Sequence, residues 1–135
     1  MNRFDKLFER FKSADCALIT SDINRRYFTG MKSSAGIVLA FPQKAYLLID
    51  FRYIEKARAT VTNAEVIELK RLFPQISELL TKHEATSMAI ESETMTVKEL
   101  NTYRHYFKDM KIVSDDSLSN DISALRMIKD EEELE

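Results

Sequence analysis

Hydrophobic residues in this chain fall into short blocks whose spacing alternates between helical and extended patterns. Four apolar residues near the N-terminus recur at intervals of three and four, the spacing of one face of an amphipathic helix. They are Phe4, Leu7, Phe8 and Phe11. The apolar run over residues 16–20 is short and has polar flanks, so it predicts a buried strand.

A polar segment follows, with the signals of a short helical turn. Ser21 or Asp22 is a suitable N-terminal cap for this turn, which carries Asn24 and Tyr27. Gly30 stands where a residue in the left-handed conformation would end it. The sequence has only two glycines, so each is expected where the backbone requires one.

Later blocks predict a layered domain. Two apolar runs, 35–41 and 44–50, are joined around Pro42 by a connection short enough for an antiparallel hairpin. Three helical patterns follow. The first is a stripe of Phe51, Ile54, Ala57 and Val61, and the second is a helix opened by Pro74. The third begins at the capping box Thr96–Glu99 and presents Val97, Leu100, Tyr103 and Phe107 on one face. Strand patterns alternate with them at 64–69, 87–91 and 111–113. The order predicts an α/β fold, a single domain with a mixed central sheet flanked by helices.

Composition and charge narrow the class of protein. A net charge of -2 offers no basic surface for nucleic acid. The single cysteine cannot form an internal disulfide, and no apolar run is long enough to span a bilayer. The N-terminus runs straight into an amphipathic helix instead of a signal peptide. We therefore expect a cytoplasmic protein that binds neither nucleic acid nor a membrane.

The chain ends in a charged segment, 126–133, with the character of a helix start. Its acidic residues suit the positive end of a helix dipole, but no capping glycine or proline follows them. We expect the chain to stop inside a longer protein. The other interpretation is an acidic tail.

Histidine and cysteine offer neither a metal site nor a nucleophile by their spacing. His83 is expected on the apolar stripe of a helix, and His105 on a helix surface. Cys16 lies in an apolar strand, where a thiol is unreactive. The sequence therefore predicts no catalytic residue and no metal ligand in this chain.

Four carboxylates suggest a different chemistry, because they fall at or just beyond the ends of predicted strands: Asp22, Asp50, Glu91 and Asp115. Gathered together, they could hold two Mg²⁺ ions for phosphoryl transfer, as in ribonuclease H-like nucleases. Aspartate and serine after strands are also the usual caps of helices and turns, which accounts for all four positions. A divalent-metal nuclease is therefore kept as an alternative function, and a free-standing interaction module as another.

Two neighbouring motifs carry a family resemblance. One is N-R-R-Y-F-T-G at 24–30, and the other is L-I-D-F-R-Y at 48–53, a strand ending in a carboxylate that opens into a helix. With the run L-R-M-I-K-D-E-E-E-L at 125–134, they resemble the N-terminal domain of the creatinase/prolidase family, which includes Xaa-Pro aminopeptidases and Xaa-Pro dipeptidases. The resemblance implies a domain over 1–124 with a ribonuclease H-like motif, and the start of a junction helix to a metallopeptidase domain at 125–135.

The resemblance also implies an activity for the complete protein. In the family, two divalent metal ions (manganese, cobalt or zinc) in the following domain activate a water that cleaves the bond before proline. The N-terminal domain serves subunit association, usually in a homodimer, and forms part of the pocket for proline-containing dipeptides or peptides. This fragment alone should be inactive. Aminopeptidase, dipeptidase and creatinase-like specificities all stay open.

The family's pocket loop corresponds to Met31, Lys32, Ser33 and Ser34 in this sequence. Lys32 could meet a substrate carboxylate and the serines could donate hydrogen bonds, although a plain solvated loop is the other interpretation. The motif residues are expected to hold this loop in place and not to react. An ion pair between Asp50 and Arg52 is one contact that would fix the loop geometry. These structural residues are Asn24, Tyr27, Gly30, Asp50, Arg52 and Tyr53.

Overall fold

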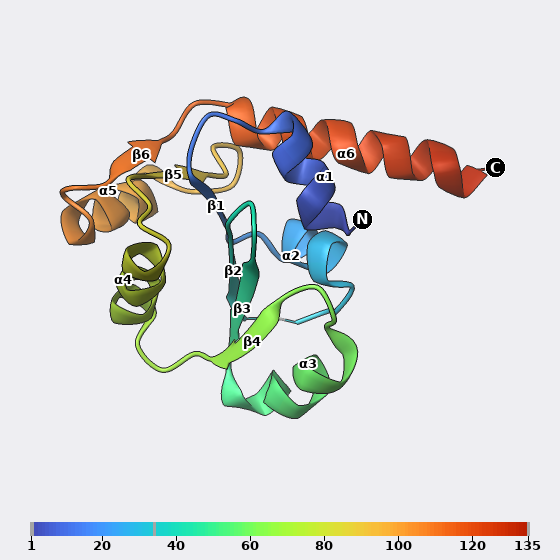
Figure 1. Cartoon of the computed structure of the whole chain (residues 1–135), viewed down its shortest axis with the longest axis horizontal. Coiled ribbons are helices and arrows are strands. Elements are labelled where there is room, and N and C mark those ends of the chain that lie inside the picture. The colour runs from blue at the N-terminus through green and yellow to red at the C-terminus, as the bar shows by residue number, and fades with distance from the viewer. Residues whose placement is uncertain (1, 34, 135) are drawn as a thin grey trace.

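Six strands form one mixed sheet in the order β4-β3-β2-β1-β5-β6 (Figure 1). The structure, a computed structural model, describes residues 2–33 and 35–134, and their side chains as far as Ile128. The strands are β1 (Cys16–Ile19), β2 (Ile37–Ala40), β3 (Ala45–Ile49), β4 (Glu65–Glu68), β5 (Ser87–Ile90) and β6 (Lys111–Val113). β2 pairs antiparallel with β1 and β3, whereas all other neighbours pair in parallel. The predicted hairpin and the mixed α/β sheet are both confirmed.

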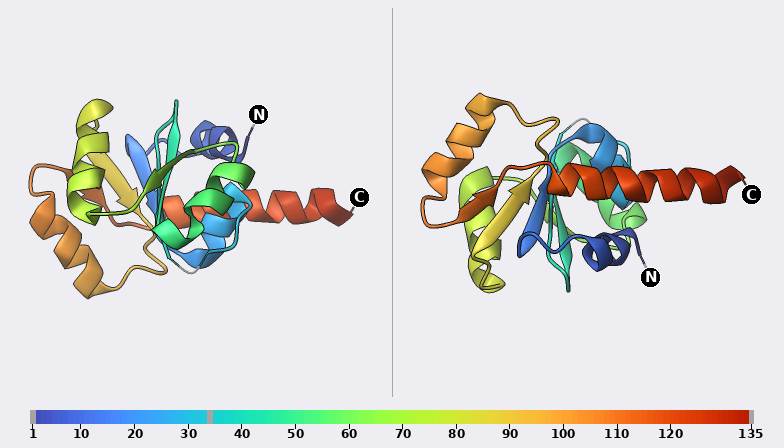
Figure 2. Two further views of the ribbon diagram at one scale, coloured as in Figure 1. Left: turned by 90° about the horizontal axis from the view of Figure 1, so that it is seen from below. Right: turned by 90° about the horizontal axis from the view of Figure 1, so that it is seen from above.

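Helices cover both faces of this sheet (Figure 2). One face carries α1 (Arg3–Arg10), α2 (Asp22–Thr29), α3 (Ile54–Thr60) and α6 (Ser117–Leu134), and the other carries α4 (Leu72–Lys82) and α5 (Val97–Tyr106). Successive strand residues point to opposite faces. In β1, Ala17 and Ile19 accordingly belong to the core under α1 and α2, while Cys16 and Leu18 belong to the core under α4 and α5.

The helix caps form largely as the sequence indicates. The Ser21 side chain accepts a hydrogen bond from the backbone N–H of Asn24, and Gly30 ends α2 with a φ of 78°. Thr96 and Glu99 form the expected reciprocal capping box at the start of α5. Each cap satisfies backbone groups that a helix end leaves without partners.

Four details differ from the expectations. Phe51 is 68% exposed because it lies in a separate 3₁₀ turn, η1 (Phe51–Tyr53), where the 3.6-residue period does not hold. Val97 is 73% exposed because it begins α5, two turns before the buried Tyr103. Helix α4 starts at Leu72, ahead of Pro74. Helix α6 starts at Ser117, well before the charged run at 126–133 that has the character of a helix start.

The C-terminal half of α6 projects away from the rest of the chain (Figures 1 and 2). The buried residues Leu118, Ile122 and Leu125 hold its first half against the sheet face that also carries α1. Met127 is 65% exposed and Ile128 is 42% exposed. None of the helices in the described part of the chain is long and apolar enough to cross a membrane.

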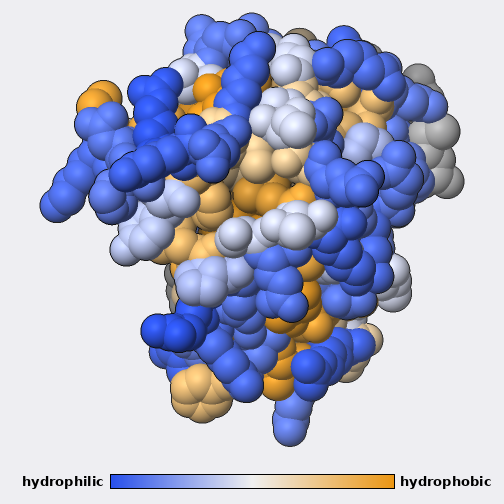
Figure 3. All heavy atoms as spheres, turned by 60° about the vertical axis from the view of Figure 1, so that its left-hand side comes forward, coloured by the Kyte–Doolittle hydropathy of each residue, from blue (hydrophilic) through white to orange (hydrophobic). Residues whose placement is uncertain are grey.

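The face of α4 and α5 carries an aromatic cluster. The Phe73 ring stacks on the Tyr106 ring with centroids 4.0 Å apart. It also makes an edge-to-face contact with Tyr103 and a tilted contact with Phe107. Figure 3 shows apolar atoms reaching the surface between hydrophilic side chains on this side of the molecule. The cluster joins the two helices and closes the core beneath them.

Candidate functional site

The candidate site lies at one edge of the sheet, where five strands end and one begins. β1, β3, β4, β5 and β6 run in the same direction, so their carboxyl ends share this edge. The reversed strand β2 starts here, after the loop that contains Lys32. In open α/β sheets, ligands bind outside the carboxyl ends of the strands.

A buried carboxylate fixes the start of α2. Glu91, directly after β5, is only 1% exposed. One of its oxygens accepts hydrogen bonds from the backbone N–H groups of Thr20 (2.6 Å) and Ser21 (2.9 Å). The other accepts from the Ser21 hydroxyl and from Nδ2 of Asn24, both at 2.7 Å. Four donors compensate the burial of this charge, and they join the end of β5 to the first turn of α2.

A buried guanidinium fixes the loop after α2. Arg25 is 2% exposed and points inward from α2. Its Nη1 donates to the carbonyls of Thr20 (3.2 Å) and Gly36 (2.9 Å). Its Nε donates to the Ser33 hydroxyl at 3.0 Å, and Nη2 donates to the Ser33 carbonyl at 2.8 Å. Arg25 therefore ties the end of β1, the loop and the start of β2 to one side chain.

The same guanidinium neutralises a carboxylate at the surface. Nη2 of Arg25 lies 2.5 Å from the Asp22 carboxylate, which is 71% exposed. Thr20 is held from both sides, because Arg25 binds its carbonyl and Glu91 binds its N–H. The two buried charges thus share one peptide segment between β1 and α2.

An open hollow of about 460 Å³ lies beside this network. Its lining comes from α2, the loop after it and η1: Asp22, Ile23, Arg26, Lys32, Ser33 and Tyr53. Lys32 and Ser33 of the predicted pocket loop line it, whereas Ser34 lies outside the described residues. Met31 does not line it; Gly30 reverses the chain, and Met31 is buried in the core at 4% exposure.

Comparison with known proteins assigns the domain. The family model described as Creatinase/Prolidase N-terminal domain matches residues 1–128, nearly the whole chain. The chain belongs to the creatinase/prolidase N-terminal domain family. The resemblance seen in the motifs at 24–30 and 48–53 is confirmed.

Curated relatives are much longer than this chain. An uncharacterized peptidase, YqhT, of Bacillus subtilis is 31% identical over 121 residues, which are 89% of this chain and 33% of the relative. A putative Xaa-Pro aminopeptidase of Mycoplasma pneumoniae is 32% identical over 97 residues, 72% of this chain and 26% of the relative. The chain spans about a third or less of the length of these proteins.

Solved structures confirm the fold class. An aminopeptidase P from Streptococcus thermophilus matches with a TM-score of 0.80 and 21% identity, covering 92% of this chain and 93% of that one. The N-terminal domain of the cytoplasmic peptidase PepQ from Mycobacterium tuberculosis matches with a TM-score of 0.78 and 24% identity, covering 91% and 97%. Both show the α/β fold of this family's N-terminal domain.

The motif residues of this creatinase/prolidase domain fall into two groups. Asp50, Arg52 and Tyr53 share one turn: the Asp50 carboxylate accepts from the backbone N–H of Arg52 (2.9 Å) and from its Nε (3.0 Å), and the guanidinium lies 5.6 Å from the Tyr53 ring centre. These contacts lower the pKa of Asp50, the backbone N–H contributing most. The predicted Asp50–Arg52 ion pair is present.

The second group lies along α2. Asn24 joins Glu91 and, through its Oδ1, Nη1 of Arg126 at 3.4 Å. Tyr27 packs edge-to-face on Phe28 and lies under the guanidinium of Arg3. Asn24 therefore connects α2 with α6, while Tyr27 connects α2 with α1.

The four strand-end carboxylates do not gather into a metal site. Asp22 pairs with Arg25, Asp50 pairs with Arg52, and Asp115 accepts from the hydroxyl and N–H of Ser117. Glu91 is saturated by its four donors. Within residues 2–33 and 35–134, no group of three or more His, Cys, Asp or Glu side chains is placed to hold a metal ion. The structure thus contradicts the clustering that the nuclease alternative requires.

Reasoning from sequence missed Arg25, Arg26 and Ile23, and it assigned Glu91 to a different role. Arg25 and Arg26 are adjacent in a polar helix, and only the position of the Ser33 and Gly36 carbonyls distinguishes the buried one. The usable signal for Glu91 was a carboxylate directly after the apolar residues Met88, Ala89 and Ile90 of a predicted strand.

Cys16 is buried in β1, and His83 packs against aromatic side chains. Burial raises the pKa of the Cys16 thiol to about 12, which keeps it protonated. His83 at the end of α4 stacks on Phe41, and its Nε2 lies 2.7 Å from the Tyr46 hydroxyl. Burial lowers the pKa of His83.

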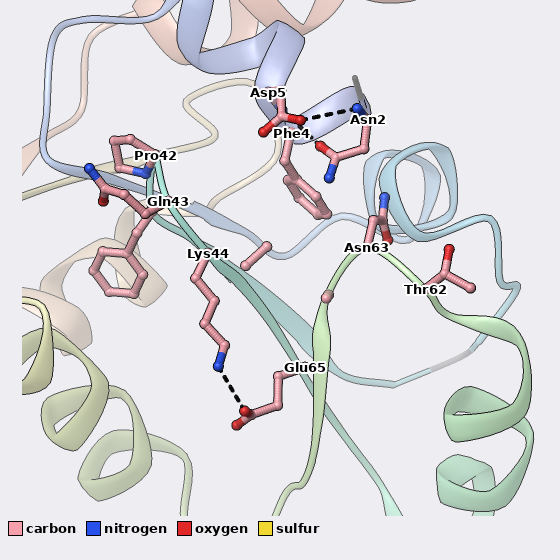
Figure 4. Close-up of a pocket in the computed structure, with 12 residues that line it drawn as sticks. Asn2, Phe4, Asp5, Pro42, Gln43, Lys44, Thr62, Asn63 and Glu65 are labelled. Carbon is pink, nitrogen blue, oxygen red and sulfur yellow. Dashed lines mark hydrogen bonds and ion pairs between the residues drawn. The ribbon is translucent and has the colours of Figure 1, made fainter.

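A second hollow lies at the opposite end of the strands (Figure 4). Its volume is about 370 Å³, and polar residues from the start of α1, the β2–β3 turn and the start of β4 line most of it. Lys44 reaches Glu65 across its rim at 2.9 Å, and Asn2 meets Asp5 within a helix cap. These four side chains already have partners, whereas the buried Oδ1 of Asn63, in the same lining, has no hydrogen-bond partner among the described residues.

Proposed function

We propose that this chain is the non-catalytic N-terminal domain of a metal-dependent Xaa-Pro peptidase. The observation that carries the proposal is the family match over 1–128 together with relatives three or more times longer, among them putative Xaa-Pro aminopeptidases. In the complete, cytoplasmic protein the hydrolysis of Xaa-Pro bonds belongs to the remaining part. Two divalent metal ions (Mn, Co or Zn) held there supply the activated water.

The role proposed for this domain is to form one wall of the substrate pocket and to take part in subunit association, as in a homodimer. The hollow supports the first role, because Lys32 and Ser33 are presented there by the Arg25 network. Two exposed apolar side chains support the second: Ile23, 63% exposed in the hollow's lining, and Phe51, 68% exposed in the turn that carries Tyr53. In this proposal, these two side chains lie under the surface of a second subunit.

The test uses the complete protein and this chain in parallel. The complete protein should hydrolyse Ala-Pro or Ala-Pro-Ala, lose the activity in EDTA and regain it with Mn²⁺. The chain alone should hydrolyse neither peptide, with or without Mn²⁺. Substitution of Lys32 by alanine should raise KM more than it lowers kcat, the pattern of lost ground-state binding. A complete protein without activity on any Xaa-Pro peptide, with every metal supplied, refutes the proposal.

A further inference from the structure

The second hollow, at the opposite end of the strands from the candidate site, contains a buried acceptor without a donor. Asn63 lies in the loop before β4, and its Nδ2 donates to the Phe28 carbonyl at the end of α2 at 2.7 Å. Because a carbonyl can only accept, this bond fixes which amide atom of Asn63 is the oxygen. That oxygen, Oδ1, is buried and has no hydrogen-bond partner among the described residues. A buried acceptor without a partner is costly, so a ligand that donates to it gains affinity.

The charged groups of the lining favour a cationic donor. Asp5 accepts from the backbone N–H of Asn2 through Oδ2, and no basic side chain of the described residues forms an ion pair with it. Lys44 is the one cation among the described lining residues, and Glu65 neutralises it at 2.9 Å. Two carboxylates against one ammonium leave the lining with an excess of one negative charge.

The size of the hollow suits a compact ligand with a short apolar part. Its volume of about 370 Å³ lies toward the lower end of the usual range of small-molecule sites, roughly 300–1,000 Å³. Phe4 and Phe41 contribute apolar atoms to the lining. Figure 4 shows Asp5, Asn63 and Glu65 on different sides of the hollow, so one small ligand can approach more than one acceptor.

Two side chains of the lining are able to make way for a ligand. The Oδ1 atom of Asn63 is covered as the hollow stands, so a donor must displace a neighbouring group to reach it. Gln43 and Thr62 are exposed parts of the lining, and neither side chain makes a hydrogen bond with any residue that the structure describes. Their rearrangement therefore breaks no such bond, while the Phe28 carbonyl keeps the Asn63 amide in place.

We propose that this hollow binds a small primary ammonium ion of the alkylamine class, which pairs with the Asp5 carboxylate and donates a hydrogen bond to Oδ1 of Asn63. A primary ammonium carries three N–H donors, so one group can serve both acceptors, and its short alkyl chain packs on Phe4. The site shares no lining residue with the hollow that contains Lys32 and is independent of the proposed peptidase activity. A lysine of a second copy of the chain or a monovalent metal ion could take the same place, and the experiment separates these sources.

The first experiment follows the amide signals of the ¹⁵N-labelled 135-residue chain by NMR while butylammonium chloride is added at low salt. The signals of residues 2–5, 42–45 and 62–65 should move, with a dissociation constant on the order of 1–10 mM for so small a ligand. 1-Butanol has a similar shape without the charge and should bind about tenfold or more weakly. Potassium chloride at the same concentrations is the control for ionic strength and for a metal ion, and it should not move these signals.

Substitutions of charged lining residues should change the affinity in opposite directions. Asp5→Asn removes the charge and keeps the shape, so it should weaken butylammonium binding about three- to fivefold. Lys44→Gln removes the competing cation and leaves Glu65 free, so it should tighten binding about three- to fivefold. Glu9→Gln makes the same change of charge at an exposed position of α1 outside the hollow, and as the matched control it should change nothing.

Substitution of Asn63 tests the buried acceptor itself. Asn63→Ala removes Oδ1 together with the bond to the Phe28 carbonyl, so circular dichroism first establishes that the variant is folded. The folded variant should bind butylammonium about tenfold or more weakly, the effect of one hydrogen bond to a charged group. If this variant does not fold, Asp5→Asn and Lys44→Gln decide the question by the signs of their effects.

The proposal is overturned by equal binding of butylammonium and 1-butanol, by the same signal shifts with potassium chloride, or by no shift at any concentration at which the chain stays folded. Unchanged affinity in both Asp5→Asn and Lys44→Gln, or in a folded Asn63→Ala, overturns it as well. Sedimentation equilibrium measures self-association of the chain. If butylammonium does not bind while Asp5→Asn abolishes self-association, the ammonium belongs to a lysine of another copy and the proposal is wrong.

Discussion

Replacing Arg25 by methionine removes the donors that hold the loop after α2 while keeping an unbranched stem of similar length. The carbonyls of Thr20, Ser33 and Gly36 then lose their contacts with a charged donor. A hydrogen bond to a charged group contributes about 1.5–3 kcal/mol, so three of them set an upper range of about 5–9 kcal/mol. Removing a buried arginine also relieves its desolvation, and water can reach the loop. We therefore expect a loss of about 3–5 kcal/mol.

A loss of that size is a large part of the ~5–15 kcal/mol that stabilises a typical domain. Urea unfolding followed by circular dichroism measures it, with an expected fall in the midpoint of about 2 M for a slope near ~2 kcal/mol per M. Arg26→Met, the neighbouring exposed arginine, is the matched control and should cost less than ~0.5 kcal/mol. Asp22→Asn removes only the exposed partner and should cost about 0.5 kcal/mol.

The reasoning is refuted if Arg25→Met and Arg26→Met lower the free energy of unfolding equally. A loss in Asp22→Asn as large as that in Arg25→Met would show that the ion pair, and not the three carbonyl contacts, stabilises the loop. An intermediate loss in Arg25→Lys is expected, since an ammonium keeps the charge but cannot reach all the acceptors in the geometry of a planar fork.

Two further predictions concern backbone strain and pH. Gly36 has a φ of 123°, and a Cβ there would lie 2.8 Å from the Leu48 carbonyl oxygen, so Gly36→Ala should cost about 3 kcal/mol by urea unfolding. Gly30→Ala, at a φ of 78° with open space around it, should cost only about 1 kcal/mol, and equal losses would contradict the argument. His83 has a pKa below its ordinary 6.5, so the unfolded chain binds a proton first as the pH falls, and stability should decrease from pH ~7 to ~5. Urea unfolding of His83→Gln over the same pH range should show a smaller decrease in stability. An unchanged decrease would mean that a group other than His83 causes it.

Local patterns predicted the elements well. The hairpin of β2 and β3 follows from two apolar runs and a short connection at Pro42, and the Thr96–Glu99 capping box follows from its spacing alone. These features depend on residues a few positions apart. Errors arose where an element changes type, as at Phe51, whose 3₁₀ turn breaks the helical period that starts at Ile54.

The site depends on contacts that no local pattern contains. Glu91 and Thr20 are 71 positions apart, and the pairing of β1 with β5 brings them together. The burial of Arg25 depends in the same way on where the start of β2 places the Gly36 carbonyl. A sequence can therefore name Lys32 and Ser33 as loop residues, but it does not reveal which side chains hold them.

The reversed direction of β2 has a consequence for how this domain can vary. The chain leaves the sheet at Thr20 and returns to it at Gly36 on the same edge. The Arg25 guanidinium binds the carbonyls of both residues and so fixes the two ends of the segment between them. Residues inside a loop with a fixed base can be exchanged, added or removed without changing the strand register. Met31 is buried and Ser33 is bound by Arg25, so the exposed Lys32 between them is the position where this loop can change its chemistry while the scaffold that carries it stays the same.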